Sequence, residues 1–338
     1  MPQEFSPIVK DWLANQDVLL AAEDRFRGEW GDILRRVAGR LAERGFTTVL
    51  TGEPPEEVKA LRPGWPGGVC GVHYEARAFP EQRRRGIVDL SLHVEQDLDN
   101  QEQVCNGLRQ LLRRHGARVP EACAAATPDE PREDILKGSL PIEGITSGRL
   151  LEAIARLALT DSFVEEALFL ADRQPLWRTD FLPGDPEVAI DVTFGQGTSE
   201  RGGWEFGPHA GRFQGRGLEA RPGEHNFRNG TNILMLNRGL FHDFVNAQAV
   251  YGCATVAAGE NTELTLCLQT DKSHGWAIAF EQVREVRQCE SWQLVTWQGR
   301  IAGDEGHDFA EEGLYAYLIA GPVTRPLRIG SLAVGICP

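Results

Sequence analysis

Apolar residues recur at steps of three and four through the first part of the chain. Between residues 23 and 45 they fall at Phe26, Trp30, Ile33, Leu34, Val37 and Leu41. This spacing places them on one face of an amphipathic helix. We therefore predict helices over residues 6–21 and 23–45, the second of them ended by Gly45, since glycine readily adopts the left-handed conformation that follows a helix.

The pattern then changes to a period of two. Apolar and polar residues alternate over residues 69–77 and 88–95, after a β-type run FTTVLTG, and this alternation is typical of half-buried strands. A helix follows, beginning near Asp99 or Asn100. These elements predict a small antiparallel sheet of at least three strands, covered by helices on one face. The polar residues 117–145 are interpreted as a surface loop, with two more helices at 147–159 and 162–173.

The last 150 residues carry a third pattern, in which short β-type runs alternate with glycine and polar turns. The runs are VAIDVTF, GRFQGRGLEAR, TNILMLN, QAVYGCATV, TELTLCLQT, WAIAFEQV, WQLVTWQG, LYAYLIAG and PLRIGSLAVGI. Such a series favours an antiparallel sandwich or jelly roll. The predicted fold class is thus α+β: an N-terminal helix-covered antiparallel sheet domain over residues 1–173, a linker rich in proline and charge at 174–186, and an all-β sandwich domain over 187–338.

Composition narrows the classes of partner and the compartment. The 338-residue chain has a formal net charge of −14, which disfavours general binding to nucleic acid or to anionic membranes. The N-terminus lacks the pattern of a secretory signal, and no run approaches the roughly 20 apolar residues that span a bilayer. The seven cysteines are scattered and resemble reduced core residues, so we expect a cytoplasmic protein.

Two His-x-Glu triplets supply the first candidate site. His73 and Glu75 lie on one predicted strand and His93 and Glu95 on the next, and the alternation places all four on one face. A hairpin closing near residues 78–86 predicts that Glu75 lies beside Asp89 and that His73 lies beside Ser91. The interpretation we favour is a polar face turned to water, as half-buried antiparallel sheets commonly have.

Two other interpretations of this face stay open, a divalent-metal or acid–base site and a partner-binding face. The residues that would carry the chemistry are His73, Glu75, Asp89 and His93. The helix–strand–strand–strand–helix layout resembles the PD-(D/E)xK nuclease core in topology. The sequence EAR departs from that core, because it ends in Arg77 where the core has lysine.

Aromatic residues supply the second candidate site, in the C-terminal domain. Tryptophan rings can stack on the apolar face of a sugar ring, and neighbouring polar side chains can orient its hydroxyl groups. The alternation in WQLVTW places Trp292 and Trp297 on opposite faces of their strand, so we expect at least one of them in the core. The candidate ligand-binding residues are Trp204, Asn226, Asp271, His274 and Trp276. The alternative is that the aromatic residues only fill the sandwich core.

The C-terminal half also resembles a known class of domain. With GWEFG, NILMLN and a closing PLRIGSLAVGI, residues 187–338 resemble the jelly-roll sandwiches of carbohydrate-binding modules and galactose-binding-like domains. This resemblance implies a glycan or another partner bound on a concave sheet or at the loop tips.

Together these patterns lead to three hypotheses for function. The first is a non-catalytic binding protein, in which the sandwich recognises a glycan or a protein and the N-terminal domain engages a protein partner. The second is a metal-dependent, nuclease-like hydrolase that uses the His-x-Glu strands. The third is an acidic chaperone-like or assembly factor that holds a basic client. The common catalytic signatures GxSxG, HExxH, the Walker motif and a strand-to-helix GxGxxG are absent from the sequence.

Overall fold

The chain forms two compact units, one made of residues 1–105 with 118–158 and the other of residues 106–117 with 159–338. The linker that the sequence predicts at residues 174–186 stays a prediction. The computed structural model describes residues 6–114, 123–125, 133–173, 175, 177–180, 204–206, 210–213, 218–220, 231–236, 249–270, 277–301, 314–321, 325 and 327–337.

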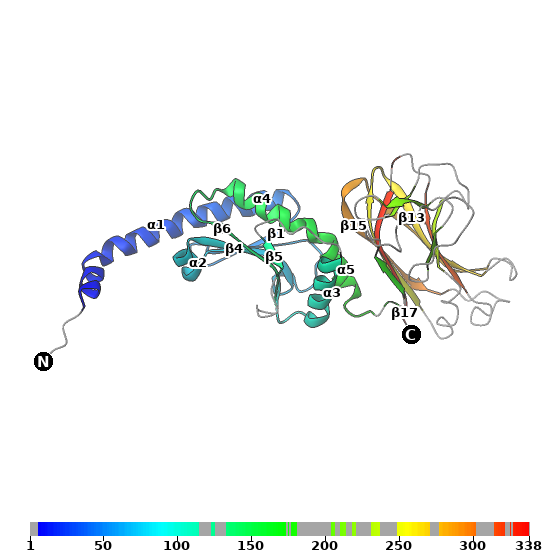
Figure 1. Ribbon diagram of the computed structural model, residues 1–338, viewed down its shortest axis with the longest axis horizontal. Coiled ribbons are helices and arrows are strands. Elements are labelled where there is room, and N and C mark those ends of the chain that lie inside the picture. Colours follow the sequence, from blue (N-terminus) through cyan, green and yellow to red (C-terminus); the bar gives the residue numbers. More distant parts are fainter. Residues whose placement is uncertain are drawn as a thin grey trace. The chain divides into compact units, whose positions relative to one another are not determined.

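The first unit is built on a six-stranded antiparallel sheet with the order β1-β2-β3-β4-β6-β5. The strands are β1 (Thr47–Thr51), β2 (Glu57–Leu61), β3 (Val72–Arg77), β4 (Ile87–Val94), β5 (Cys123–Ala125) and β6 (Asp134–Pro141). The helices α1 (Pro7–Glu43) and α4 (Ser147–Leu157) lie together along one side of this sheet (Figure 1). The shorter elements are η1 (Gly68–Cys70), α2 (Pro80–Arg85) and α3 (Gln101–Arg114), the last of which runs into the second unit.

The prediction of two N-terminal helices is wrong in one respect, because α1 is a single helix of 37 residues. Only Ala22 lies between the two predicted spans, and it and its neighbours Ala21 and Glu23 are good helix formers that give the helix no reason to stop. Gly45 follows the helix with φ 80°, as expected. The predicted apolar stripe is confirmed over the second half of α1, where Trp30, Leu34, Val37 and Leu41 are at most 1% exposed.

The prediction of a long loop over residues 117–145 is also wrong, since β6 occupies Asp134–Pro141 and pairs with β4. The strand has the sequence DILKGSLP, in which apolar and polar residues do not alternate strictly, and only its first three residues are buried. It therefore lacks the pattern that identifies a strand from sequence. The strand β2 was missed as well. It is five residues long and lies close to Pro54, Pro55 and Pro63, which are typical of loops.

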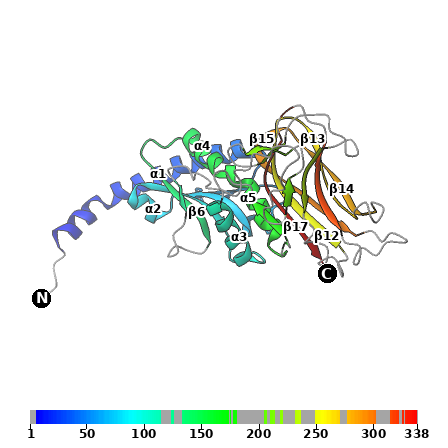
Figure 2. The ribbon, with the colours of Figure 1, turned by 45° about the vertical axis from the view of Figure 1, so that its right-hand side comes forward.

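The second unit is a β-sandwich, as predicted, and Figure 2 shows its two sheets facing each other. One sheet has the order β15 (Cys289–Arg300), β12 (Ala249–Ala258), β17 (Leu327–Cys337), β10 (Leu218–Ala220), β9 (Ala210–Phe213), and β7 (Trp177–Asp180) also pairs with β17. The other has the order β14 (Ile278–Val286), β13 (Thr262–Gln269), β16 (Tyr315–Ala320), β11 (Thr231–Leu236), β8 (Trp204–Phe206). The predicted run VAIDVTF lies outside the described residues, and every other predicted run contains a strand.

The apolar core of the sandwich is formed by side chains from both sheets. Trp297 of β15, Leu266 of β13 and Leu318 of β16 are completely buried there together with Val250 of β12. The ring of Trp297 also donates a hydrogen bond from Nε1 to the backbone oxygen of Leu264, at 3.4 Å. This arrangement confirms that Trp297 is the core tryptophan of the WQLVTW segment.

Helix α5 (Asp161–Leu170) packs on the outer face of the β12–β17 sheet. Its Glu166 is completely buried, and Thr255 Oγ1 donates to Glu166 Oε2 at 2.9 Å. Ser331 Oγ lies 3.1 Å from the same carboxylate oxygen. Nearby, the ring of Phe169 packs edge-on against Tyr251, with 6.2 Å between the ring centroids. The helix is therefore part of the second unit's buried structure.

Within the part of the chain that the structure describes, no helix has both the length and the apolar content needed to cross a membrane.

The stripe on α1 yields a paired stability prediction. Leu34 and Leu20 lie on the same helix, but Leu34 is 0% exposed and Leu20 is 53% exposed. Leu34→Ala should therefore lower the free energy of unfolding by about 2–5 kcal/mol, because it leaves a cavity. Leu20→Ala should change it by no more than about 0.5 kcal/mol. Urea unfolding of both variants measures this, and equal effects would show that the first half of α1 is buried in solution.

Candidate functional site

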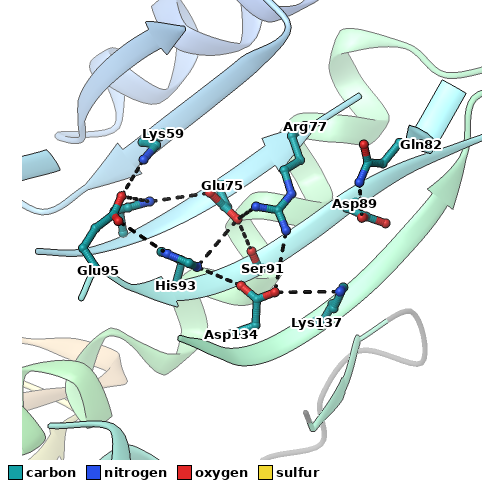
Figure 3. Close-up of polar contacts among 11 residues, drawn as sticks. Lys59, Glu75, Arg77, Gln82, Asp89, Ser91, His93, Glu95, Asp134 and Lys137 are labelled. Atoms are coloured by element: carbon teal, nitrogen blue, oxygen red, sulfur yellow. Dashed lines mark hydrogen bonds and ion pairs between the residues drawn. The ribbon is translucent and has the colours of Figure 1, made fainter. Parts of the chain in front are cut away.

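Charged and polar side chains gather on one face of the sheet in the first unit (Figure 3). We call this set the polar-face cluster: Glu57 and Lys59 of β2, His73, Glu75 and Arg77 of β3, Asp89, Ser91 and His93 of β4, Glu95 just after β4, and Asp134 and Lys137 of β6. Alternation places the cluster opposite the apolar face that carries Tyr74 and Leu92. The prediction that His73 and His93 share a face is confirmed.

The predicted register of the hairpin is wrong by two residues. His73 pairs with His93, Glu75 with Ser91 and Arg77 with Asp89. The connection between the strands is not a simple turn but contains α2, which ends at Gly86 with φ 68°. Because the error is an even number of residues, the predicted faces are still correct. The two imidazole rings lie directly across from each other, with centroids 5.3 Å apart.

The prediction that this face is turned to water is also wrong for its inner members. His73 is 0% exposed, Glu75 and Asp134 are each 2% exposed, and Asp89 is 5% exposed. Longer side chains around them are more open, with Arg77 at 21% and Lys137 at 31%. The Cβ atoms of residues opposite each other on neighbouring strands stand about 4.5–5.5 Å apart, so a long basic side chain can reach over a shorter side chain beside it and shield it from water.

Opposite charges face each other across the strands. Glu57 is paired with Arg77 and Lys59 with Glu75 between β2 and β3. Arg77 is paired with Asp89 between β3 and β4. Since like charges in these positions would repel, the alternation of sign stabilises this register of the sheet.

Glu75 lies at the centre of the cluster. Its Oε1 is 2.7 Å from Arg77 Nη1 and accepts a hydrogen bond from Ser91 Oγ, also at 2.7 Å. Burial on its own raises the pKa of a carboxyl group, but the contacts with His73, Arg77 and Ser91 outweigh burial and hold the pKa of Glu75 well below its usual range. Glu75 is therefore ionised at neutral pH.

The two histidines differ in their contacts. His93 Nδ1 lies 2.8 Å from Asp134 Oδ1. Burial opposes protonation of His93, but this hydrogen bond and the charges of Glu75, Asp134 and Glu95 raise its pKa above the ordinary value. His73 is buried, and burial lowers its pKa. Its Nε2 lies 3.6 Å from Glu75 Oε2, and neither ring nitrogen has a hydrogen-bond partner among the described residues.

A metal-ligand geometry exists within the cluster. Glu75, His93 and Asp134 each offer a donor atom, and these three atoms lie within 4.8 Å of one another. Of the four predicted catalytic residues, the structure brings His73, Glu75 and His93 together. Asp89 is directed elsewhere, because it accepts a hydrogen bond from Gln82 Nε2 at 2.9 Å.

Sequence reasoning missed Asp134, which lies on the strand that was interpreted as a loop. Its position depends on the pairing of β6 with β4, which sets Asp134 opposite His93. The two residues are 41 positions apart, so no local spacing connects them. The available signal was the apolar Ile135-Leu136 pair that follows Asp134 in a polar stretch.

The predicted ligand-binding residues of the sandwich stay predictions. Trp204 lies in β8, whose backbone the structure describes. The other four, Asn226, Asp271, His274 and Trp276, lie outside the described residues.

A different tryptophan, Trp292, lies on the outer face of the sandwich and is partly exposed. A Cβ added at Gly330 would stand 3.1 Å from Trp292 Cζ3, 3.3 Å from Cε3 and 3.4 Å from Cη2. Three adjacent ring atoms at nearly equal distances mean that the ring presents its face to Gly330. Since β12 separates β15 from β17, the indole lies across the sheet. The guanidinium carbon of Arg328 is 5.4 Å from the ring centroid.

We call Trp292, Gly330 and Arg328 the tryptophan platform. Glycine is the residue that makes it possible, because any side chain at position 330 would have to displace the ring. The opposite placement of Trp292 and Trp297, predicted from the alternation, is confirmed.

Comparison with known proteins gives structural neighbours only. No protein-family model matches the chain, and no curated protein matches it. Among solved structures, the xylan-binding CBM22-1 domain of Paenibacillus barcinonensis Xyn10C matches at 17% identity over 48% of this chain and 94% of that domain, with a TM-score of 0.29. BiXyn10A CBM1 matches at 10% identity over 48% of this chain and 99% of that module, with a TM-score of 0.30.

A third neighbour is the N-terminal cellulose-binding domain of Cellulomonas fimi β-1,4-glucanase C, at 13% identity over 41% of this chain and 91% of that domain, with a TM-score of 0.28. The resemblance to carbohydrate-binding modules that the strand pattern suggested is thus found again among solved structures. All three TM-scores are below 0.5.

The contacts of His93 predict a pH dependence of stability. The folded protein binds the His93 proton more tightly than the unfolded chain does, so this stabilisation is present below the ordinary pKa of 6.5 and is lost as the pH rises through the raised folded pKa. The loss of unfolding free energy caused by His93→Gln should therefore be larger at pH 6 than at pH 9.

Urea unfolding at the two pH values, with a chelator present, measures the difference. The charged and titratable groups that face His93 are His73, Glu75, Glu95 and Asp134, and they are retained in both proteins. Asp89→Asn is the control and should cost the same at both pH values. An equal cost of His93→Gln at pH 6 and pH 9 would contradict the assignment of a raised pKa.

Proposed function

We propose that this is a non-catalytic binding protein whose β-sandwich recognises a carbohydrate on the tryptophan platform. The observation that carries the proposal is the face-on placement of Trp292 over Gly330. A ring held against the sheet on one face can offer its other face to a ligand. The C–H groups of a sugar ring pack well on such an aromatic face.

The neighbours of the ring suit a sugar. The guanidinium of Arg328 lies over the indole ring and supplies several N–H donors, and hydroxyl groups accept hydrogen bonds from such donors. One of these donors already binds the backbone oxygen of Glu290 at 3.3 Å, which fixes the guanidinium beside the ring. An aromatic surface with a few fixed polar groups is the usual composition of a small-molecule site.

For the first unit we propose a protein-binding role. On the first half of α1, the exposed fractions are 69% for Val18, 51% for Leu19 and 53% for Leu20. Large exposed apolar patches often mark interaction surfaces, and these three side chains add apolar area to this exposed part of the helix. We also propose that the protein works in a reducing compartment, the cytoplasm, because Cys105, Cys253 and Cys267 are free cysteines buried in the core.

Binding to carbohydrate can be tested directly. The wild-type protein should bind at least one soluble polysaccharide from a panel of xylans, glucans and mannans, with saturation in isothermal titration calorimetry. Trp292→Ala should weaken this binding by about tenfold or more, which corresponds to about 1.4 kcal/mol for the loss of one stacking surface. Trp292→Phe keeps an aromatic face and should bind with intermediate affinity.

Glu285→Ala, on the other sheet, is the matched control and should bind as the wild type does. Trp204→Ala and Trp276→Ala test the residues predicted from sequence. If these variants lose binding while Trp292→Ala keeps it, the tryptophan platform is not the site. If no polysaccharide binds the wild-type protein, carbohydrate recognition itself is wrong.

A further inference from the structure

The polar-face cluster has more negative than positive groups. It contains five carboxylates, Glu57, Glu75, Asp89, Glu95 and Asp134, and three basic side chains, Lys59, Arg77 and Lys137. When all five carboxylates are ionised and both histidines are neutral, as ligation of a metal by His93 requires, two negative charges are left over. Charges that are removed from water need a compensating partner, and one divalent cation supplies the missing charge.

The donor atoms are placed for such an ion. His93 Nδ1 is 2.8 Å from Asp134 Oδ1 and 3.9 Å from Glu75 Oε1. Ligand atoms that bind one zinc-sized ion at about 2.0–2.2 Å stand roughly 3–4 Å apart, so a bound ion would replace the hydrogen bond between His93 and Asp134. The three groups come from three adjacent strands, β3, β4 and β6, so the rigid sheet fixes their spacing.

His73 is an independent indication of a missing ligand. Its side chain is 0% exposed, and its Nε2 points between Glu75 Oε2 at 3.6 Å and Glu95 Oε1 at 3.8 Å. Both distances are too long for a hydrogen bond, and neither ring nitrogen has a hydrogen-bond partner among the described residues. Buried polar atoms in folded proteins are nearly always satisfied, so an additional group in the cluster explains this orphaned ring.

The basic side chains hold the ligands in position. Arg77 contacts Glu75 at 2.7 Å and lies 3.6 Å from Asp134, and Ser91 donates to Glu75. Lys137 lies 3.8 Å from Asp134. Carboxylates that bind a metal are commonly oriented by such outer hydrogen bonds. Imidazole together with carboxylate favours Zn²⁺ or Mn²⁺ over Ca²⁺, which prefers oxygen ligands alone.

We propose that the first unit binds one divalent transition-metal ion through Glu75, His93 and Asp134, with His73 as the adjacent buried donor. This binding is independent of the carbohydrate site and uses different residues. The proposal assigns a bound ion to the cluster, and it assigns no reaction.

Titration of the chelator-treated full chain with Zn²⁺ and with Mn²⁺ tests the proposal. Calorimetry should give one ion per chain for at least one of the two metals, and Ca²⁺ should bind at least about tenfold more weakly. His93→Ala and Asp134→Asn should each weaken the binding by at least about tenfold. Asp89→Asn removes one charge from the same face without removing a proposed ligand, so its affinity should stay within twofold of the wild type.

Each alternative result overturns the proposal in a different way. Wild-type protein that binds neither metal stoichiometrically has no such site. An equal loss from Asp89→Asn and Asp134→Asn means that the ion is attracted by the net charge of the face and not by specific ligands. If His93→Ala binds the metal as tightly as the wild type does, the imidazole of His93 is not a ligand.

A measurement on the wild-type protein covers the case in which a variant does not fold. The ring nitrogens of His93 and His73 should change their ¹⁵N chemical shifts when one equivalent of Zn²⁺ is added, because imidazole ligation changes the electronic state of the ring. Unchanged shifts for both rings at saturating metal would overturn the proposal. None of these measurements involves a glycan, so their outcome is separate from that of the carbohydrate proposal.

Discussion

The ion pairs across β2, β3, β4 and β6 are the constraint on which the first unit depends. Glu75 and Asp134 are almost completely buried, and an ionised carboxylate without a partner is strongly destabilising in that position. The sheet solves this by setting a basic residue opposite or beside each of them. A slip of one residue in any of these pairings would turn the charged side chains towards the apolar face. The register and the charge pattern therefore specify each other.

Much of this arrangement could be predicted from the sequence, because periodicity is a local property. The apolar stripe with Trp30, Leu34 and Leu41, the shared face of His73 and His93, and the opposite faces of Trp292 and Trp297 all follow from spacing alone. The division into an α+β unit followed by a sandwich follows from the change of period along the chain.

What could not be predicted depends on contacts that are distant in sequence. The register of β3 and β4 is set by the helix in their connection, and the role of Asp134 is set by a strand pairing across 41 positions. Alternation also tells which face a side chain is on but not whether neighbours cover it, which is why the inner residues of the cluster were expected to be exposed. The position of the Trp292 ring depends on Gly330, and a glycine inside a strand is only a general sign of close approach.

The buried carboxylate of Glu166 makes helix α5 part of the independently folding sandwich domain. A fragment cut at residue 187 would keep all of β12 and β17 but would leave Thr255 and Ser331 without the acceptor that α5 provides. It would also uncover Tyr251, which packs against Phe169. A fragment meant to fold as this sandwich should therefore begin before Asp161. It then includes helix α5, which a domain boundary drawn from the strands alone would leave out.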